Sequence, residues 1–443
     1  MKSSHGTDRF VKITYAVILV LILNIFCGCG VSDMIDEANG QDAEKPNAIK
    51  VIDVNGDEIE TSVSVIDESE AEDNESAPLP ASNLALTAQN FSYSDYDRFA
   101  YSQLSESGKT TYREIYTVLN DLIGGVELTS RDADEVDPAF RAVMLDHPEI
   151  FYVKGYSIKK YMSGSDLKKI VFSGTYTMQK DEIERAREEV EAYVDDFIAD
   201  APVSADDYDI IKYVYDRLIR TNEYVPESKN NQNILSVVEN GQTVCQGYTK
   251  MMQLLLNRMG IFCTLVNGTA CGQNGVPDAD ELKNAANTEW GGHVWNIVKC
   301  NGMYYNVDTT WGDAVITLMS DDGALTRDID INYEFFLVDD ASLIGTHDPQ
   351  PVVTMPRCNS MEDSYYNHEG LYFTDIDSDQ FYRAFESAYE NGETYLFLKA
   401  ADNDVFEKIK KHLFEDQNIF QYMGRTNVRY VDFSDRNLIM ISL

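Results

Sequence analysis

The chain has 443 residues and carries 75 acidic against 36 basic side chains, a formal net charge of −39. Its 44% hydrophobic content is ordinary for a folded protein, and its length allows two or three compact domains. The charge argues against a nucleic-acid-binding surface. The seven cysteines show no paired short spacings in the body of the chain, which argues against a disulfide scaffold or a zinc ribbon. An acidic, solvated surface is the simplest meaning of the charge, and an attraction for basic substrates is the alternative.

Residues 1–29 predict an export signal. Basic residues near the start precede an almost wholly apolar run over residues 13–26, which has the form of a signal-peptide core. Gly28 then precedes Cys29, and this end of the run resembles the lipobox of bacterial lipoproteins. The resemblance implies that Cys29 is lipidated and anchors the chain at the extracellular face of the cell membrane. A plain secretory signal and an uncleaved anchor are the alternatives, and both also place the rest of the chain outside the cytoplasm.

Residues 30–94 predict an acidic linker without stable structure. Residues 31–90 contain 15 acidic residues, 2 basic residues and no aromatic residue, so their net charge is −13. Such a composition buries too little apolar surface to offset the conformational entropy of the chain. We therefore expect an extended, charged tether, with a short strand within residues 49–54 as a local exception.

An N-terminal α+β region is predicted over residues 95–200, where aromatic residues become frequent. Apolar residues at helical spacing within residues 111–123 and an amphipathic pattern over residues 180–199 predict two helices. Residues 168–177 are typical of a strand. This region carries no recognisable chemistry, and His147, which precedes a proline, is interpreted as a structural turn residue.

A helix is predicted to begin at Cys245. Apolar residues at helical spacing follow it as far as Arg258, and Gly260 is a C-terminal stop signal. Amide groups in the first turn of a helix lack intrahelical partners and carry partial positive charge, which favours the thiolate of a cysteine placed there. A cysteine that only packs in the core is the alternative.

An Asn-Gly pair at residues 301–302, between two apolar runs, predicts a tight β-hairpin. If these two residues form the loop, Asp308 lies opposite Trp295. His293 shares a sheet face with both, and Asp308 becomes its diagonal neighbour at roughly 7–8 Å between backbones. The register therefore predicts that the carboxylate orients the imidazole, whereas a slip by one residue would separate them.

Cys245, His293 and Asp308 together supply the parts of a nucleophilic acyl-transfer triad. The imidazole accepts the thiol proton and later protonates the leaving group, and the carboxylate holds the imidazole in place. Trp295 and Trp311 are candidates for the walls of this site, with core packing as their alternative role.

Three sequence blocks here resemble the bacterial transglutaminase-like superfamily, which has a papain-like cysteine protease core. They are Cys-Gln-Gly-Tyr from residue 245, Gly-His-Val-Trp-Asn from residue 292 and Asn-Val-Asp-Thr-Thr-Trp from residue 306. The resemblance implies an α+β core in which a helix bearing the Cys packs on an antiparallel sheet bearing the His and Asp. The implied catalytic domain spans residues 201–350, and its flanks look like those of surface members from Gram-positive anaerobes.

The site departs from that of animal transglutaminases, in which a Trp next to the Cys helps to bind the oxyanion. Here Gln246 follows Cys245, and no Trp precedes it. Gln232 is the candidate for an upstream oxyanion donor, with an ordinary loop glutamine as the alternative. No calcium loop is recognisable, so no metal or cofactor is expected, and both hydrolysis and amide exchange stay open.

Residues 360–443 predict a small α+β accessory domain, with helices over residues 379–390 and 404–415. For the whole chain, the resemblance implies a membrane-anchored, extracellular cysteine enzyme that acts on peptide or amide bonds, either a protease or a transglutaminase-like enzyme. Its expected partners are a protein or peptide substrate, of which cell-wall peptides are one class, and the membrane; nucleic acid is not expected. The alternative is a catalytically silent domain that serves as a binding or scaffold module at the cell surface.

Overall fold

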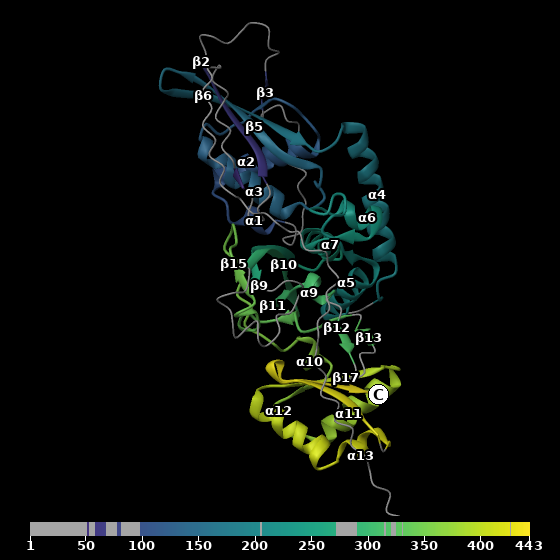
Figure 1. Ribbon diagram of the computed structural model, residues 1–443. Coiled ribbons are helices and arrows are strands. Elements are labelled where there is room, and N and C mark those ends of the chain that lie inside the picture. The colour runs from purple at the N-terminus through teal and green to yellow at the C-terminus, as the bar shows by residue number, and fades with distance from the viewer. Residues whose placement is uncertain are drawn as a thin grey trace, which may run out of the picture.

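The computed structural model describes residues 51–52, 58–67, 78–80, 98–203, 206–271, 290–313, 316–319, 325–329, 331–425 and 427–443. The predicted export signal and Cys29 lie outside these residues. Among the helices that are described, none is both long and apolar enough to cross a membrane. The chain is elongated, with an N-terminal part, a middle part and a C-terminal module following one another from top to bottom (Figure 1).

The N-terminal part consists of a mixed sheet covered by short helices. The sheet has the strand order β1-β2-β5-β6-β4-β3, and β5 and β6 form an antiparallel hairpin at its centre. Ser105 starts the longest of these helices, because its side chain accepts a hydrogen bond from the amide of Gly108. The elements are β1 (Val51–Ile52), β2 (Glu58–Asp67), β3 (Leu79–Pro80), α1 (Phe99–Ser102), α2 (Glu106–Asn120), β4 (Val126–Glu127), η2 (Ala133–Glu135), α3 (Val136–Asp146), β5 (Val153–Ser163) and β6 (Asp166–Tyr176).

The expectation of an unstructured linker over residues 30–94 is wrong for β2. This strand pairs in parallel with β5 along most of its length, from Glu60 opposite Gly155 to Asp67 opposite Met162. Isoleucine, threonine and valine recur through β2, and such β-branched residues favour strands. The acidic average over the whole segment concealed this local pattern, and the open edge of β5 supplied the backbone partners.

The middle part packs helices against a sheet in which every pairing is antiparallel, with the order β14-β11-β10-β9-β15. This arrangement confirms the predicted α+β class and its core of a Cys-bearing helix on an antiparallel sheet. The elements are α4 (Lys180–Ala199), α5 (Asp207–Thr221), β7 (Glu223–Tyr224), α6 (Leu235–Asn240), β8 (Gln242–Thr243), α7 (Cys245–Arg258), β9 (Cys263–Cys271), β10 (Trp290–Cys300), β11 (Met303–Val307), α9 (Thr309–Gly312), β12 (Ile316–Met319), β13 (Leu325–Ile329), β14 (Phe336–Val338), η4 (Asp340–Leu343) and β15 (His347–Pro349).

The predicted register of the β10–β11 hairpin is confirmed. Cys300 lies opposite Met303, and the pairing continues to Asn296 opposite Val307. The two loop residues, 301 and 302, have φ values of 48° and 88°, as a type I′ turn requires.

Helix α7 is fixed on the sheet by contacts on its first turns. Thr249 Oγ1 donates a hydrogen bond to the carbonyl of Val294 at 3.2 Å, and Asn296 Nδ2 donates to the carbonyl of Thr249 at 3.1 Å. Gly247 allows the preceding loop to approach, because a Cβ at this position would lie 1.8 Å from Thr243 Oγ1. Together these contacts place the start of α7 beside β10.

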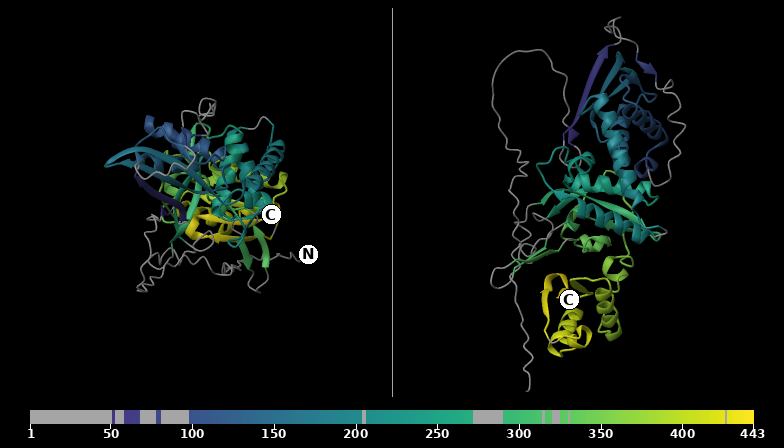
Figure 2. Two further views of the ribbon diagram at one scale, coloured as in Figure 1. Left: turned by 90° about the horizontal axis from the view of Figure 1, so that it is seen from above. Right: turned by 90° about the vertical axis from the view of Figure 1, so that its right-hand side faces the viewer.

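The C-terminal module has a four-stranded sheet with the order β16-β17-β19-β18 and a hydrophobic core of its own. It forms the lower end of the molecule (Figure 2). Lys399 and Arg436 tie it to the middle part through ion pairs with Glu334 at 3.3 and 3.0 Å. The elements are α10 (Tyr365–His368), β16 (Tyr372–Phe373), α11 (Ser378–Glu390), β17 (Tyr395–Ala400), α12 (Asn403–Lys410), η5 (Lys411–Glu415), α13 (Ile419–Met423), β18 (Arg429–Phe433), η6 (Ser434–Arg436) and β19 (Leu438–Ser442).

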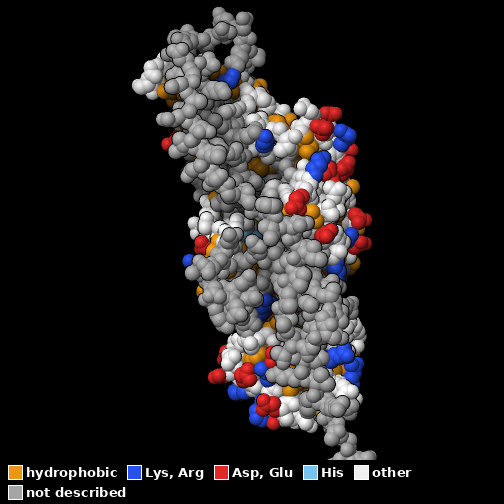
Figure 3. All heavy atoms as spheres, in the orientation of Figure 1, with side chains coloured by type: hydrophobic (Ala, Val, Ile, Leu, Met, Phe, Trp, Pro, Cys, Tyr) orange, Lys and Arg blue, Asp and Glu red, His pale blue; other side chains and the backbone are white. Residues whose placement is uncertain are grey.

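On the face shown in Figure 3, acidic and basic side chains are mixed over the described surface. Some of them pair across elements, as Arg258 of α7 does with Glu191 of α4 at 2.8 Å. Exposed ion pairs of this kind contribute little to stability. The fold therefore rests on its buried clusters rather than on these surface charges.

Candidate active site

Cys245 is the first residue of α7 and carries a free, partly exposed thiol. The residue before it, Val244, is the N-cap and offers no side-chain acceptor to the helix. The backbone amide of Gly247 bonds to the carbonyl of Val244 at 3.0 Å, so the amides of Cys245 and Gln246 are the first-turn donors left beside the sulfur among the described contacts. Such a position favours negative charge on the thiol and on any oxyanion formed next to it.

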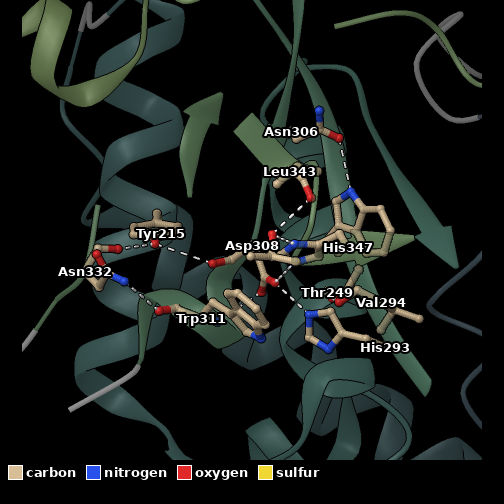
Figure 4. A network of polar contacts seen from close by, with 12 residues as sticks. Tyr215, Thr249, His293, Val294, Asn306, Asp308, Trp311, Asn332, Leu343 and His347 are labelled. Atoms are coloured by element: carbon tan, nitrogen blue, oxygen red, sulfur yellow. Dashed lines mark hydrogen bonds and ion pairs between the residues drawn. The ribbon is translucent and has the colours of Figure 1, made fainter. Parts of the chain in front are cut away.

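His293 and Asp308 form a short, buried hydrogen bond across the hairpin. His293 lies on β10, Asp308 caps α9 just after β11, and the imidazole Nε2 is 2.6 Å from the carboxylate Oδ2 (Figure 4). The other carboxylate oxygen, Oδ1, accepts the backbone N–H of Trp311 at 3.0 Å. The diagonal contact expected from the hairpin register is therefore present, and it orients the imidazole.

Cys245 lies near enough to His293 to raise the pKa of its imidazole. Because Nε2 of the imidazole faces Asp308, Nδ1 is the nitrogen left for the thiol. The fold thus brings together three side chains from a helix start, a strand and a helix cap, in the arrangement that nucleophilic catalysis needs.

The charges within the site follow from these contacts. Burial disfavours a charge on His293, but the neighbouring Asp308 carboxylate and Cys245 outweigh it and raise the imidazole pKa to about 10. Burial likewise disfavours a charge on Asp308, yet His293 holds the pKa of that carboxyl well below its usual range. At neutral pH the pair is therefore an imidazolium and a carboxylate, and a positive imidazolium beside a thiol favours the thiolate.

His347 is a site residue that the sequence did not reveal. Its fully buried side chain places Nε2 3.0 Å from Asp308 Oδ2, the same oxygen that His293 contacts. Burial lowers the pKa of His347, which favours a neutral ring. It lies on β15, 39 residues after Asp308, and neither a motif nor a periodic pattern marks it.

Trp295 and Trp311 border the two histidines and also belong to a buried cluster. Their rings lie 5.0 and 4.5 Å from the ring of His347, and each is about 6 Å from His293. Trp295 Nε1 donates to Asn306 Oδ1 at 3.1 Å, which satisfies its polar atom. The two roles set out for these residues, packing and shaping the site, are therefore compatible.

Gln232 is exposed, and its carbonyl accepts a hydrogen bond from Lys250 Nζ at 2.9 Å. Among the described residues its side-chain amide has no hydrogen-bond partner, and its role as an oxyanion donor stays a prediction. Gln246, next to the thiol, is 2% exposed, and neither amide atom of its side chain meets a partner within the described part of the chain.

His293, Asp308 and His347 are also a group whose ligand atoms lie within 4.8 Å of one another, close enough to share a metal ion. Here both imidazoles point at one carboxylate oxygen, at 2.6 and 3.0 Å. A metal ion would have to replace both hydrogen-bonded protons. The observed N–O distances are those of hydrogen bonds, so we interpret the group as two imidazoles hydrogen-bonded to one carboxylate.

Comparison with known proteins identifies the middle part. A family model described as the transglutaminase-like superfamily matches residues 198–309, which include Cys245, His293 and Asp308. Among curated proteins, none matches the chain significantly.

Two solved structures show distant likenesses. A crystal structure of a TGase is 10% identical, with 42% of this chain and 51% of that chain covered and a TM-score of 0.23. The periplasmic domain of TgpA from Pseudomonas aeruginosa, bound to ethylmercury, is 19% identical, with 32% and 55% covered and a TM-score of 0.19. The chain thus spans about half the length of each. TM-scores this low do not establish a common fold.

Proposed function

We propose that this chain is a cysteine acyl-transfer enzyme acting on peptide or amide bonds, because residues 198–309 match a family model of the transglutaminase-like superfamily. The observation that carries the proposal is the series Cys245, His293 and Asp308, in which His293 contacts Asp308 at 2.6 Å and Cys245 raises the pKa of the same imidazole. Its ends lie at a helix start and at a helix cap, which hold the reacting groups in fixed positions.

In the first half of the proposed reaction, the Cys245 thiolate attacks the carbonyl carbon of the substrate. A carbon–sulfur bond forms, and the carbonyl oxygen takes the negative charge beside the first-turn amides of α7. The His293 imidazolium gives its Nδ1 proton to the leaving nitrogen as the carbon–nitrogen bond breaks. The products are a free amine, a thioester on Cys245 and a neutral imidazole, so atoms and charge balance.

In the second half, the neutral imidazole accepts a proton from the incoming nucleophile, which attacks the thioester and expels the Cys245 thiolate. Water as the nucleophile gives hydrolysis, and an amine gives a new amide. Asp308 supports both halves, because it keeps Nε2 of the imidazole protonated and Nδ1 directed at the sulfur.

We further propose that the enzyme works at the extracellular face of a membrane, anchored through a lipid on Cys29, with peptides or proteins of the cell surface as substrates. The basic start, the apolar run and the small residue before Cys29 support this location. Metabolic labelling with a radioactive fatty acid tests it: the label should be incorporated by the chain and lost in a Cys29→Ala variant. An unlabelled wild type would reject the lipid anchor.

The proposed chemistry is tested by alkylation of the full chain with iodoacetamide at a pH of about 5.5, where an ordinary thiol is almost wholly protonated. Cys245 should react much faster than the buried Cys263, Cys271, Cys300 and Cys358, and a Cys245→Ala variant should lose the fast phase. A screen of peptide hydrolysis against amine incorporation then identifies the acceptor.

The competing function is that of a catalytically silent scaffold. The alkylation of Cys245 distinguishes it from the proposed enzyme. If Cys245 reacts no faster than a free cysteine at this pH, and Cys245→Ala leaves all measured activity unchanged, the enzyme proposal fails. In that case the domain serves as a binding module.

A further inference from the structure

We propose that His347 is a positioning residue for the reaction, one that fixes the Asp308 carboxylate. The inference rests on the proposed function, because it assigns a task within the same triad. His347 is 39 residues from Asp308 in the sequence and lies on a strand that carries none of the triad.

Three hydrogen-bond donors surround the carboxylate of Asp308. Asp308 accepts three N–H groups: the backbone of Trp311 on Oδ1 at 3.0 Å, and the rings of His293 and His347 on Oδ2 at 2.6 and 3.0 Å (Figure 4). Trp311 and His293 hold one oxygen each, and His347 gives Oδ2 a second donor. Turning the carboxylate out of this orientation would therefore break three hydrogen bonds rather than two.

His347 is itself held in place by its neighbours. Its other ring nitrogen, Nδ1, lies 2.9 Å from Thr346 Oγ1, and its side chain is fully buried. The ring of Trp311 packs against it at 4.5 Å, and the ring of Trp295 meets it edge-on at 5.0 Å. A side chain confined in this way transmits its position to the carboxylate it touches.

The charge of His347 follows from its buried surroundings. Ionising His347 would bury a second positive charge close to that of His293, and removing such a charge from water is costly. Burial indeed lowers the pKa of His347, whereas Asp308 and Cys245 raise that of His293. A neutral His347 donates to Asp308 through Nε2 when the Thr346 hydroxyl donates to Nδ1 rather than to the Leu343 carbonyl, which lies 3.0 Å from that hydroxyl. We assign this arrangement to His347, which then orients Asp308 without competing with His293 for the proton used in the reaction.

The pairing of two strands places His347 in the site. Strand β15 is an edge strand that pairs with β9, with His347 opposite Ala270 and Pro349 opposite Gly268. A Cβ at Gly268 would lie 2.3 Å from the carbonyl oxygen of Asp348 and 2.9 Å from the ring of Trp295. A glycine at this position is what lets β15 and the tryptophan close on β9 together.

The consequence for the reaction appears when His293 is neutral, after it has protonated the leaving group. Its Nε2 must then keep its hydrogen so that Nδ1 is free to accept the proton of the incoming nucleophile. A carboxylate fixed by His347 selects that tautomer. A loose carboxylate would permit the other tautomer, which cannot act as the base.

The test compares His347→Phe with His347→Gln in the full chain. Phenylalanine keeps a ring of similar size but removes the donor, whereas glutamine restores an N–H at similar reach. For His347→Phe we expect kcat to fall about 100-fold with KM unchanged, since a misplaced catalytic group costs about that much. His347→Gln should recover at least about one tenth of the wild-type kcat, and fast alkylation of Cys245 should fall and recover in parallel.

His147 provides the matched control. It is as deeply buried, bonds to Glu149 at 2.7 Å and lies in the N-terminal part, outside the site. His147→Phe should lower stability and leave kcat unchanged. If His347→Phe fails to fold, Thr346→Val removes the hydroxyl that holds the ring, and kcat should then fall several-fold with KM unchanged.

The outcomes separate this inference from the proposed function. If wild-type Cys245 shows no fast alkylation, the proposed function fails and this inference fails with it. If wild-type Cys245 is fast and folded His347→Phe keeps kcat within about threefold, only the inference is overturned. Equal losses in folded His347→Phe and His347→Gln would also overturn it, because the donor would then not matter.

Discussion

At the scale of single residues, one buried carboxylate controls the charge of the whole site. Asp308 is 2% exposed and accepts three N–H groups, so its negative charge is compensated without water. Its charge in turn keeps His293 protonated. Any effect of Asp308 on Cys245 therefore passes through His293, because no hydrogen bond joins Asp308 to the sulfur among the described contacts.

Replacing Asp308 by Asn keeps the shape and removes the charge. Burial then dominates at His293 and the imidazole loses its proton near neutral pH, so we expect kcat to fall by about 10⁴, as for the equivalent change in serine proteases. Fast alkylation of Cys245 at a pH of about 5.5 should disappear as well. Asp348→Asn, on the exposed part of β15, is the control. Fast acidic alkylation in Asp308→Asn would contradict the assigned charges.

The same pair predicts how stability depends on pH. The pKa of His293 is raised to about 10, so its contribution to folding is complete below its unfolded value of about 6.5 and is lost as pH rises through about 10. The pKa of Asp308 is lowered, so its contribution is complete above about pH 3.9 and is lost as pH falls below that value.

Urea unfolding of wild type and Asp308→Asn across this range provides the measurement. The difference in the free energy of unfolding should be largest between about pH 4 and 6.5 and should shrink on both sides. A difference that grows above about pH 8 would have the wrong sign and would exclude the imidazolium–carboxylate pair.

At the scale of elements, two glycines set how closely the site's supports approach. Gly247 brings the loop before α7 against the helix, and Gly268 brings β15 and Trp295 against β9. Neither glycine has a positive φ, so what each position requires is space rather than an unusual backbone conformation. An added methyl group at either site would press on atoms that are themselves packed or paired.

Gly268→Ala should therefore displace β15. We expect a loss of about 1–3 kcal/mol in the free energy of unfolding, as for other overpacked sites, and a lower kcat because His347 moves with its strand. Gly291→Ala is the matched control on β10, where a Cβ meets nothing within 4 Å. Denaturant unfolding and kcat are measured on both variants, and equal behaviour of the two would refute the close-contact argument.

At the scale of the whole molecule, the described chain has more than one hydrophobic core. One buried cluster runs through the N-terminal and middle parts, from Ala100 to Leu337, whereas the C-terminal module has its own cluster from Tyr366 to Ile441. The links between module and middle part include the ion pairs on Glu334 and a stacked pair of tyrosine rings, Tyr333 and Tyr365. The module can thus unfold without opening the active site.

Phe406→Ala, in the core of the module, tests this. The three tryptophans lie at positions 290, 295 and 311, so tryptophan fluorescence follows the middle part, while circular dichroism follows the whole chain. We expect the variant to lose about 3–5 kcal/mol in a transition seen by circular dichroism, with the fluorescence transition and kcat unchanged. Phe336→Ala lies in the core shared by the N-terminal and middle parts, so it should destabilise the transition seen by fluorescence and lower kcat. Coincident transitions by both probes would show one cooperative unit.

The sequence by itself determined the features that depend on neighbours in the chain. The Asn-Gly turn and the alternation of apolar residues set the register of β10 and β11, and with it the contact of His293 with Asp308. A helix stop and apolar spacing placed Cys245 at a helix start. These signals are local, because a turn type and a side-chain period each act over only a few residues.

Only the tertiary structure decided the features that depend on distant partners. Strand β2 exists because β5 offers it an open edge, and His347 reaches Asp308 because β15 docks on β9 where Gly268 leaves room. A short edge strand such as β15 carries little propensity of its own, and for both strands the backbone partner is chosen by packing across long separations in the sequence. The contact of His293 with Asp308 could therefore be predicted from the sequence, whereas the contact of His347 with the same carboxylate could not.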